Sequence, residues 1–238
     1  MLDYQNQLGS NVIVESSAFT KLFRSVFVWM SLALVLTGMT AFYVAGYLER
    51  HLDFLAQHQG LFWVFAIAEL AVVFILSARL HKMSFMTSGI MFAIYSILNG
   101  ITLSTILLVY TRESVATTFF VTAGTFAVMS FIGYTTKKDL TSFSKLFMML
   151  LIGLVIATIV NIFWANSTLG WVITYVGVVL FVGLTAFDTQ KIKNMLLQVG
   201  VEDNEMSRKV ALMGSLQLYL DFINLFIYLL RILGDRRE

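Results

Sequence analysis

The fold of this chain is decided by residues 146–187, LFMMLLIGLVIATIVNIFWANSTLGWVITYVGVVLFVGLTAF, a stretch without a charged residue. A transmembrane helix needs roughly 20 consecutive apolar residues, so the stretch is long enough for two of them. The turn-forming residues ANSTLG at 165–170 are the one break in it. We therefore predict two membrane-spanning helices, at about 146–164 and 170–188.

Charge-poor intervals of similar length lie on both sides of this stretch. They predict five further spans, at about 25–48, at about 60–78, between Lys82 and Arg112, between Glu113 and Lys137, and at about 210–230. The predicted fold class is therefore an all-α membrane protein with seven transmembrane helices.

The composition supports this interpretation. Of the 238 residues, 58% are hydrophobic and 13% are charged, whereas an ordinary soluble domain has roughly 25% charged residues. A soluble globule of this size cannot bury so much apolar surface, so the excess must face lipid. The composition excludes soluble enzymes, disordered chains and nucleic-acid-binding proteins, and we expect no nucleic-acid partner. The chain has no cysteine, which excludes disulfides and thiolate metal sites.

The distribution of Lys and Arg predicts the orientation. The N-terminal segment and the loops after spans two, four and six hold eleven of these residues, whereas the alternate loops hold only Arg50 and Arg112. Basic loops stay in the cytoplasm, so the N-terminus is predicted to be cytoplasmic. We expect a polar cytoplasmic tail at 1–20 and a single membrane domain at 21–238. The exceptions are Arg231, Arg236 and Arg237, because they lie outside if the last helix crosses fully. Either the tail escapes the rule or that helix is re-entrant.

Three ionisable residues lie within the predicted spans: Glu69, Asp188 and Asp221. Insertion scales put the cost of an Asp at the bilayer centre at about 2.5–3.5 kcal/mol, so such residues usually face the bundle interior and mark function. The last span adds a polar stripe with spacings of three and four residues, made of Gly214, Gln217, Asp221, Asn224 and Tyr228. A helix with one polar stripe belongs at the centre of a bundle or beside a cavity.

Catalytic interpretations of these residues fail. An intramembrane aspartyl protease would use Asp188 and Asp221 as its pair of carboxylates. The GxGD context of such enzymes is absent before Asp221, and a chain without proline cannot contain their Pro-Ala-Leu motif. A retinal protein needs a lysine in the last helix, and residues 210–230 contain none. We therefore expect no enzymatic activity.

Two segments resemble the signature of the Bax inhibitor-1 family of membrane proteins. They are GLTAFDTQKIK (183–193) and LYLDFINLFIYLLRILG (218–234). The segments KKDL (137–140) and NGITLS (99–104) are also similar to bacterial members of this family. The resemblance extends over essentially the whole chain from the first span onward. It implies six helices around a central seventh, which agrees with the polar stripe.

The resemblance also implies a pH-sensitive calcium leak. In this family two aspartates on helices six and seven share a proton and sense pH, and they correspond to Asp188 and Asp221. A basic residue at the inner end of helix two latches onto the helix-six aspartate, and Arg79 is the candidate for that residue. The expected pH sensor and gate are therefore these three side chains, in a protein of the cell inner membrane.

The chemistry of carboxyl groups supports this expectation. Two carboxylates within hydrogen-bond distance cannot both ionise cheaply, so such a pair titrates as a unit. Calcium prefers oxygen ligands, so Asp188 and Asp221 with a neighbouring amide would form a weak site suited to conduction. We expect Ca²⁺ as the permeant ion, with no tightly bound cofactor. The polar lining of the pore or cavity is expected to comprise Asn224, Gln217, Glu69 and Asn99.

Two other functions fit the same features. A proton-coupled secondary transporter would also need carboxyl groups near the membrane midplane. A non-transporting regulator would bind a membrane-anchored ATP-dependent protease, which could grip the polar tail at 1–20. The expected partners are the lipid bilayer, calcium ions, protons and, for the regulator, that protease. A monomer and a small homo-oligomer are both compatible with the sequence.

Overall fold

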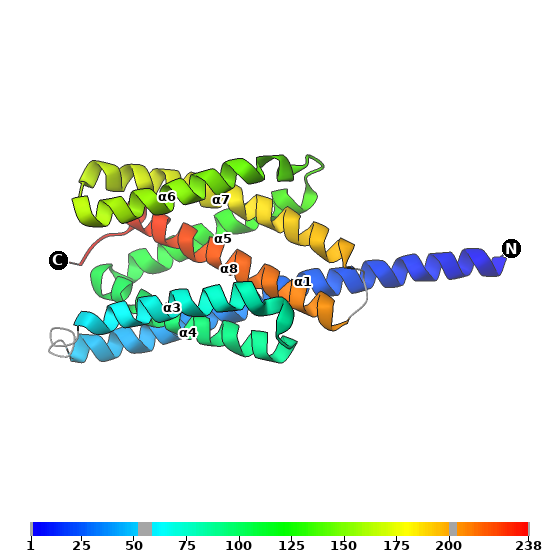
Figure 1. The fold of residues 1–238 in the computed structure, drawn as a ribbon, viewed down its shortest axis with the longest axis horizontal. Coiled ribbons are helices and arrows are strands. Elements are labelled where there is room, and N and C mark those ends of the chain that lie inside the picture. Colours follow the sequence, from blue (N-terminus) through cyan, green and yellow to red (C-terminus); the bar gives the residue numbers. More distant parts are fainter. Residues whose placement is uncertain (1, 52–58, 200–203, 238) are drawn as a thin grey trace. The chain divides into compact units, whose positions relative to one another are not determined.

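The computed structural model describes residues 2–51, 59–199 and 204–237 (Figure 1). Within these residues the chain forms seven α-helices and two short 3-10 helices, and no β-strand. In chain order they are α1 (Leu2–Arg50), α3 (Gln59–Arg79), η1 (Leu80–Lys82), α4 (Phe85–Val109), α5 (Arg112–Thr135), η2 (Leu140–Phe143), α6 (Ser144–Trp164), α7 (Ser167–Gln198) and α8 (Glu205–Leu233). The predicted all-α fold with seven long helices is confirmed.

Six of these helices are long and apolar enough to cross a membrane, among the residues described. They are α1 from Ala18 onward, α4, α5, α6 together with η2, α7 and α8. The helix α3 occupies the predicted second span but is not one of the six. The most apolar window of α8 is 72% buried, whereas that of α6 is 6% buried. The polar-striped helix α8 is thus the most enclosed of the six.

Helix ends differ most from the predicted spans at two places. The tail expected at 1–20 is helical from Leu2 and continuous with the first span. The helix α7 continues to Gln198 rather than ending near residue 188, because no glycine or proline lies between Asp188 and Gly200. The break inside 146–187 falls as predicted. Ala165 ends α6 in the left-handed conformation with φ 46°.

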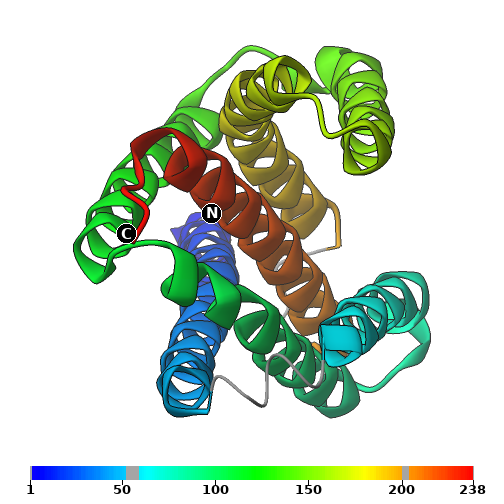
Figure 2. The ribbon, with the colours of Figure 1, turned by 90° about the vertical axis from the view of Figure 1, so that its left-hand side faces the viewer.

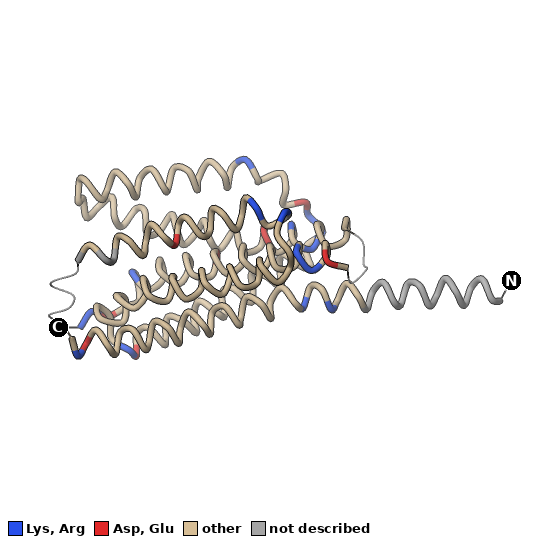
Figure 3. The backbone as a smooth tube through the Cα atoms, turned by 60° about the horizontal axis from the view of Figure 1, so that its bottom comes forward, with Lys and Arg blue, Asp and Glu red and all other residues tan. Residues whose placement is uncertain are grey.

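The chain forms two compact units. Unit one comprises Met1–Thr105 with Ile192–Leu216, and unit two comprises Ile106–Lys191 with Gln217–Glu238. Most charged residues lie near helix ends, with long uncharged stretches between them (Figure 3), and exceptions are Glu69, Asp188 and Asp221, which lie inside α3, α7 and α8. This distribution is the one expected of helices that pass through hydrocarbon.

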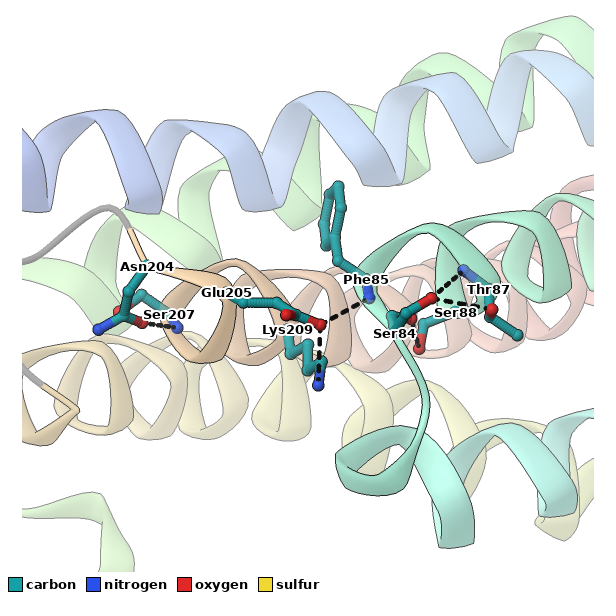
Figure 4. Close-up of polar contacts among 8 residues, drawn as sticks. All are labelled: Ser84, Phe85, Thr87, Ser88, Asn204, Glu205, Ser207 and Lys209. Carbon is teal, nitrogen blue, oxygen red and sulfur yellow. Dashed lines mark hydrogen bonds and ion pairs between the residues drawn. The ribbon is translucent and has the colours of Figure 1, made fainter.

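Unit one is held together by close helix contacts and by paired helix starts. At Gly100 on α4, a Cβ atom would lie 2.6 Å from the Thr37 carbonyl oxygen of α1, so only glycine permits this crossing. The start of α4 meets the start of α8 (Figure 4). There the Glu205 carboxylate accepts a hydrogen bond from the Phe85 N–H at 3.3 Å and pairs with Lys209 at 3.1 Å.

Unit two is built around an apolar cluster between α6, α7 and α8. Its buried members are Leu154, Ile173, Leu180, Phe181, Leu184, Phe187 and Leu225. Helices α6 and α7 lie side by side as an antiparallel pair (Figure 2). Glycine again sets the closest approaches. A Cβ atom on Gly133 of α5 would collide with the backbone of Ala186 in α7, and one on Gly177 of α7 would lie 2.7 Å from the Tyr228 ring of α8.

The C-terminal tail has a defined place in unit two. Helix α8 is continuous to Leu233, and the tail then pairs with the connector between α4 and α5. The Thr111 N–H donates to the Asp235 carbonyl oxygen at 2.9 Å, and the Arg237 N–H donates to the Val109 carbonyl oxygen at 2.9 Å. An unbroken α8 does not match a re-entrant helix. The tail instead lies at the same end of unit two as the connector that the charge pattern predicts to be outside.

Candidate functional site

The candidate site is a pair of buried carboxyl groups in unit two. Asp188 on α7 is 3% exposed, and Asp221 on α8 is 4% exposed. Their side chains lie in hydrogen-bonding contact. The two carboxyls lie well inside long helices, because α7 runs on to Gln198 and α8 begins at Glu205. Because both helices extend beyond the two carboxyls, Asp188 and Asp221 can meet although they are far apart in the sequence.

The described residues of the protein supply the pair with few hydrogen-bond donors. The Gln217 side chain donates from Nε2 to Asp188 Oδ1 at 2.7 Å. Asp221 Oδ2 is buried and has no hydrogen-bond donor among the described residues. Ionised carboxylates are acceptors only, so two of them in contact repel each other, and one proton between them removes that repulsion. Lys191, one turn further along α7, is the charged side chain whose field reaches both carboxyls.

The loop between α5 and η2 is fastened to α7 just beyond Asp188. The buried Gln190 side chain donates from Nε2 to the Lys138 carbonyl oxygen at 2.9 Å. Its Oε1 atom accepts from the Leu140 N–H at 2.8 Å. The amide thus pairs with the backbone on both sides of Asp139. Sequence reasoning missed Gln190 and Lys191, although both lie in a segment that carries the family resemblance.

The remaining residues of the α8 stripe contact other groups. The Asn224 Nδ2 atom donates to the Leu220 carbonyl oxygen at 2.8 Å, one turn back on its own helix. The Tyr228 ring stacks on Phe181 with the ring centres 5.9 Å apart. Of the expected lining residues on α8, the structure places Gln217 in contact with the carboxyl pair.

Glu69 and Asn99, the other expected lining residues, form a separate polar cluster in unit one. The Asn99 Nδ2 atom donates to Glu69 Oε1. The Thr102 hydroxyl donates to Glu69 Oε2 at 2.8 Å. These bonds give the acid of α3 two donors from α4. The structure therefore brings these two predicted residues together with Thr102.

Arg79 and the predicted calcium site remain predictions. Arg79 ends α3 in unit one and is exposed. Asp188 belongs to unit two. Within the described ranges, no group of three or more His, Cys, Asp or Glu side chains is arranged to hold a metal ion. The weak calcium site would therefore consist of the two carboxyls Asp188 and Asp221 with neutral oxygen atoms.

Comparison with known proteins gives matches along almost the whole chain. The family model described as "Inhibitor of apoptosis-promoting Bax1" matches residues 19–238. The inner membrane protein YbhL of Escherichia coli (strain K12) is 45% identical over 229 residues, covering 96% of this chain and 97% of YbhL. An uncharacterized protein of Borreliella burgdorferi is 41% identical over 220 residues, covering 92% and 93% of the two chains. An uncharacterized protein of Deinococcus radiodurans is 39% identical over 210 residues, covering 88% of each chain.

Proposed function

This chain belongs to the Bax inhibitor-1 family, and we propose that it is a pH-sensitive calcium leak channel of the inner membrane, gated by a proton that Asp188 and Asp221 share. The observation that carries the proposal is the contact between two buried carboxyls on neighbouring helices of unit two. The name of the YbhL relative supports the inner-membrane location, and the loop charges support a cytoplasmic N-terminus.

The gate follows from the electrostatics of the pair. With one proton between them, Asp188 and Asp221 attract each other and join α7 to α8. Loss of that proton leaves two negative charges in contact in a poorly solvated interior, and they repel. The repulsion separates α7 from α8, so the leak increases as the pH rises. Lys191 limits the repulsion, since its positive charge acts on both carboxyls.

Once separated, the Asp188 and Asp221 carboxylates could also bind calcium, the proposed permeant ion. Calcium is a hard cation that binds carboxylate and amide oxygens. Asp188, Asp221 and the amide oxygen of Gln217 offer fewer ligands than the six to eight that calcium takes in a tight site. The ion therefore passes through and is not retained.

The direct test is calcium entry into proteoliposomes that contain only the purified protein and an enclosed calcium dye. We expect entry that increases with pH, and a weaker pH response for Asp188→Asn. Asp235→Asn is the matched control, because it makes the same change on an exposed carboxyl of unit two. Absence of calcium entry at every pH would contradict the proposed function. An equal pH response in both variants would remove the carboxyl pair from the gate.

A further inference from the structure

The buried face of α5 carries a row of hydroxyl groups. The buried residues of this helix are Ser114, Thr118, Thr122, Phe126, Ser130 and Gly133. The first five follow one another at intervals of four, so each lies about one turn beyond the last and the row winds gradually around the buried side of the helix. Ser114 and Ser130 are separated by roughly 24 Å along the helix axis. Four of the five side chains are hydroxyls, and one is a phenyl ring.

Two of these hydroxyls have no hydrogen-bond partner among the residues that the structure describes. Thr118 Oγ1 and Ser130 Oγ lie in residues that are 0% and 5% exposed. In the described part of the chain, the one other buried side-chain atom in this condition is Asp221 Oδ2, and all three lie in unit two. Buried polar atoms in proteins almost always have a partner, and water or an ion supplies it where the protein does not. Thr118 and Ser130 therefore offer two unpartnered hydroxyls to water or an ion, whereas the Thr122 and Ser114 hydroxyls donate to backbone carbonyl oxygens.

The ring in the row is held against α8 beside the carboxyl pair. The Phe126 ring contacts the Phe222 ring edge-on, with centres 5.5 Å apart and an angle of 67°. Phe119, also on α5, contacts Phe222 at 5.5 Å. Phe222 is the residue directly after Asp221. Any movement of α8 at Asp221 therefore moves the ring that contacts Phe126.

We propose that the hydroxyl row of α5 is the path of water and hydrated divalent cations through unit two, and that the Phe126–Phe222 ring pair is its hydrophobic plug. This inference rests on the proposed calcium leak, for which it names the path. The hydroxyl oxygens replace part of the hydration of the ion, while apolar rings exclude water from the closed path. At its other end the row reaches Gly133, which packs against Ala186, two residues before Asp188.

Cysteine labelling tests whether water reaches the hydroxyl row of α5. The native chain has no cysteine, so Thr118→Cys and Ser130→Cys can be labelled singly with a small water-soluble methanethiosulfonate in oriented membrane vesicles. We expect both cysteines to react when both faces of the membrane are exposed to the reagent. The matched control is Val128→Cys, because Val128 is 57% exposed on the same helix, and we expect an exposed apolar residue of a membrane-spanning helix to face lipid. We expect it to be protected. Protection of both Thr118→Cys and Ser130→Cys would show a dry packing face and overturn the proposal.

Labelling from one face only tests the plug. Reagent added on the Ser114 side should modify Thr118→Cys several-fold faster than Ser130→Cys, because Phe126 lies between them. Phe126→Ala should remove this difference, and Phe126→Leu should reduce it while keeping an apolar side chain. Phe131→Ala is the control, since Phe131 is 67% exposed on α5. A difference that persists in Phe126→Ala would overturn the plug.

The labelling results are independent of calcium entry. Cysteines that react in vesicles that do not admit calcium would support a water path and contradict the calcium leak. Calcium entry with both row positions protected would support the leak and place its path elsewhere. The two proposals therefore fail in different experiments.

Discussion

Arg79 is an exposed arginine at the end of α3, where the run Arg79-Leu80-His81-Lys82 begins. If its guanidinium holds the ionised Asp188 carboxylate, the Arg79→Ala variant loses an attraction that keeps the gate shut. We expect this variant to leak more calcium at neutral pH than the unchanged protein, in the proteoliposome assay. Arg50→Ala is the control, because Arg50 is also exposed at a helix end of unit one. Equal leaks in the two variants would leave Arg79 as an ordinary anchor at the membrane surface.

For single residues, the sequence predicts the carboxyl pair better than it predicts the side chains around that pair. Asp188 and Asp221 stand out because acids are costly in a membrane span, and Gln217 because it lies on the same stripe. Gln190 and Lys191 were missed, because the predicted span ended near residue 188 and put both in a loop. The hydrogen bond of Asn224 to its own helix was also unpredictable, since an amide at that spacing can reach either a neighbouring helix or its own backbone.

Among the helices, the contact of α5 with α7 depends on a single missing side chain. Gly133→Ala would place a Cβ atom against the Ala186 backbone, and overpacking of this kind typically costs about 1–3 kcal/mol. Gly124→Ala is the matched control on α5, because no atom of the described residues lies within 4 Å of its added Cβ atom. We expect thermal unfolding in detergent at a lower temperature for Gly133→Ala and at an unchanged or higher temperature for Gly124→Ala. The reverse order would contradict the packing described.

The short helix η2 begins at a cap outside the membrane-spanning segments. The Asp139 carboxylate accepts hydrogen bonds from the Thr141 hydroxyl at 2.7 Å and from the Thr141 N–H at 2.9 Å. These two bonds hold the pKa of Asp139 below its usual range, and the bond from the Thr141 hydroxyl has the larger effect. The cap therefore stabilises η2 fully above the pKa of an unfolded Asp, and the stabilisation is lost as the pH falls through the folded value.

Amide hydrogen exchange of residues 140–143 measures this cap. We expect Asp139→Ala to exchange faster at neutral pH, because it loses both acceptor bonds. Asp139→Asn keeps an acceptor oxygen without a titrating group, so its protection should not fall on acidification. Equal exchange in the unchanged protein and in Asp139→Ala would show that the cap does not stabilise η2.

The helices themselves were predicted well, and their ends less so. Long charge-free stretches gave the number of helices, and ANSTLG gave the turn between α6 and α7. The extension of α7 to Gln198 was missed, because hydropathy marks the lipid-crossing part of a helix and not where its hydrogen bonding stops. The glycine contacts at Gly133 and Gly177 could not be predicted, because sequence alone does not show which helices touch.

For the whole molecule, the loop charges predict which end of each helix faces the cytoplasm. Ser142 lies in η2 and Asn166 in the connector from α6 to α7, so they mark opposite ends of α6, and both are exposed. We expect Ser142→Cys to react only with reagent on the cytoplasmic face, and Asn166→Cys only with reagent on the outer face. The reverse labelling would contradict the orientation that the Lys and Arg distribution indicates.

The proposed gate depends on Asp188 and Asp221 acting as one proton-binding unit. The most direct measurement is the pH dependence of calcium entry for Asp188→Asn, Asp221→Asn and the double variant in proteoliposomes. We predict that each single variant flattens the pH response and that the double variant is no worse than either, because a shared proton is lost with the first substitution. Independent and additive effects of the two substitutions, or a full pH response in all three variants, would show two separate structural carboxyls and contradict the gate.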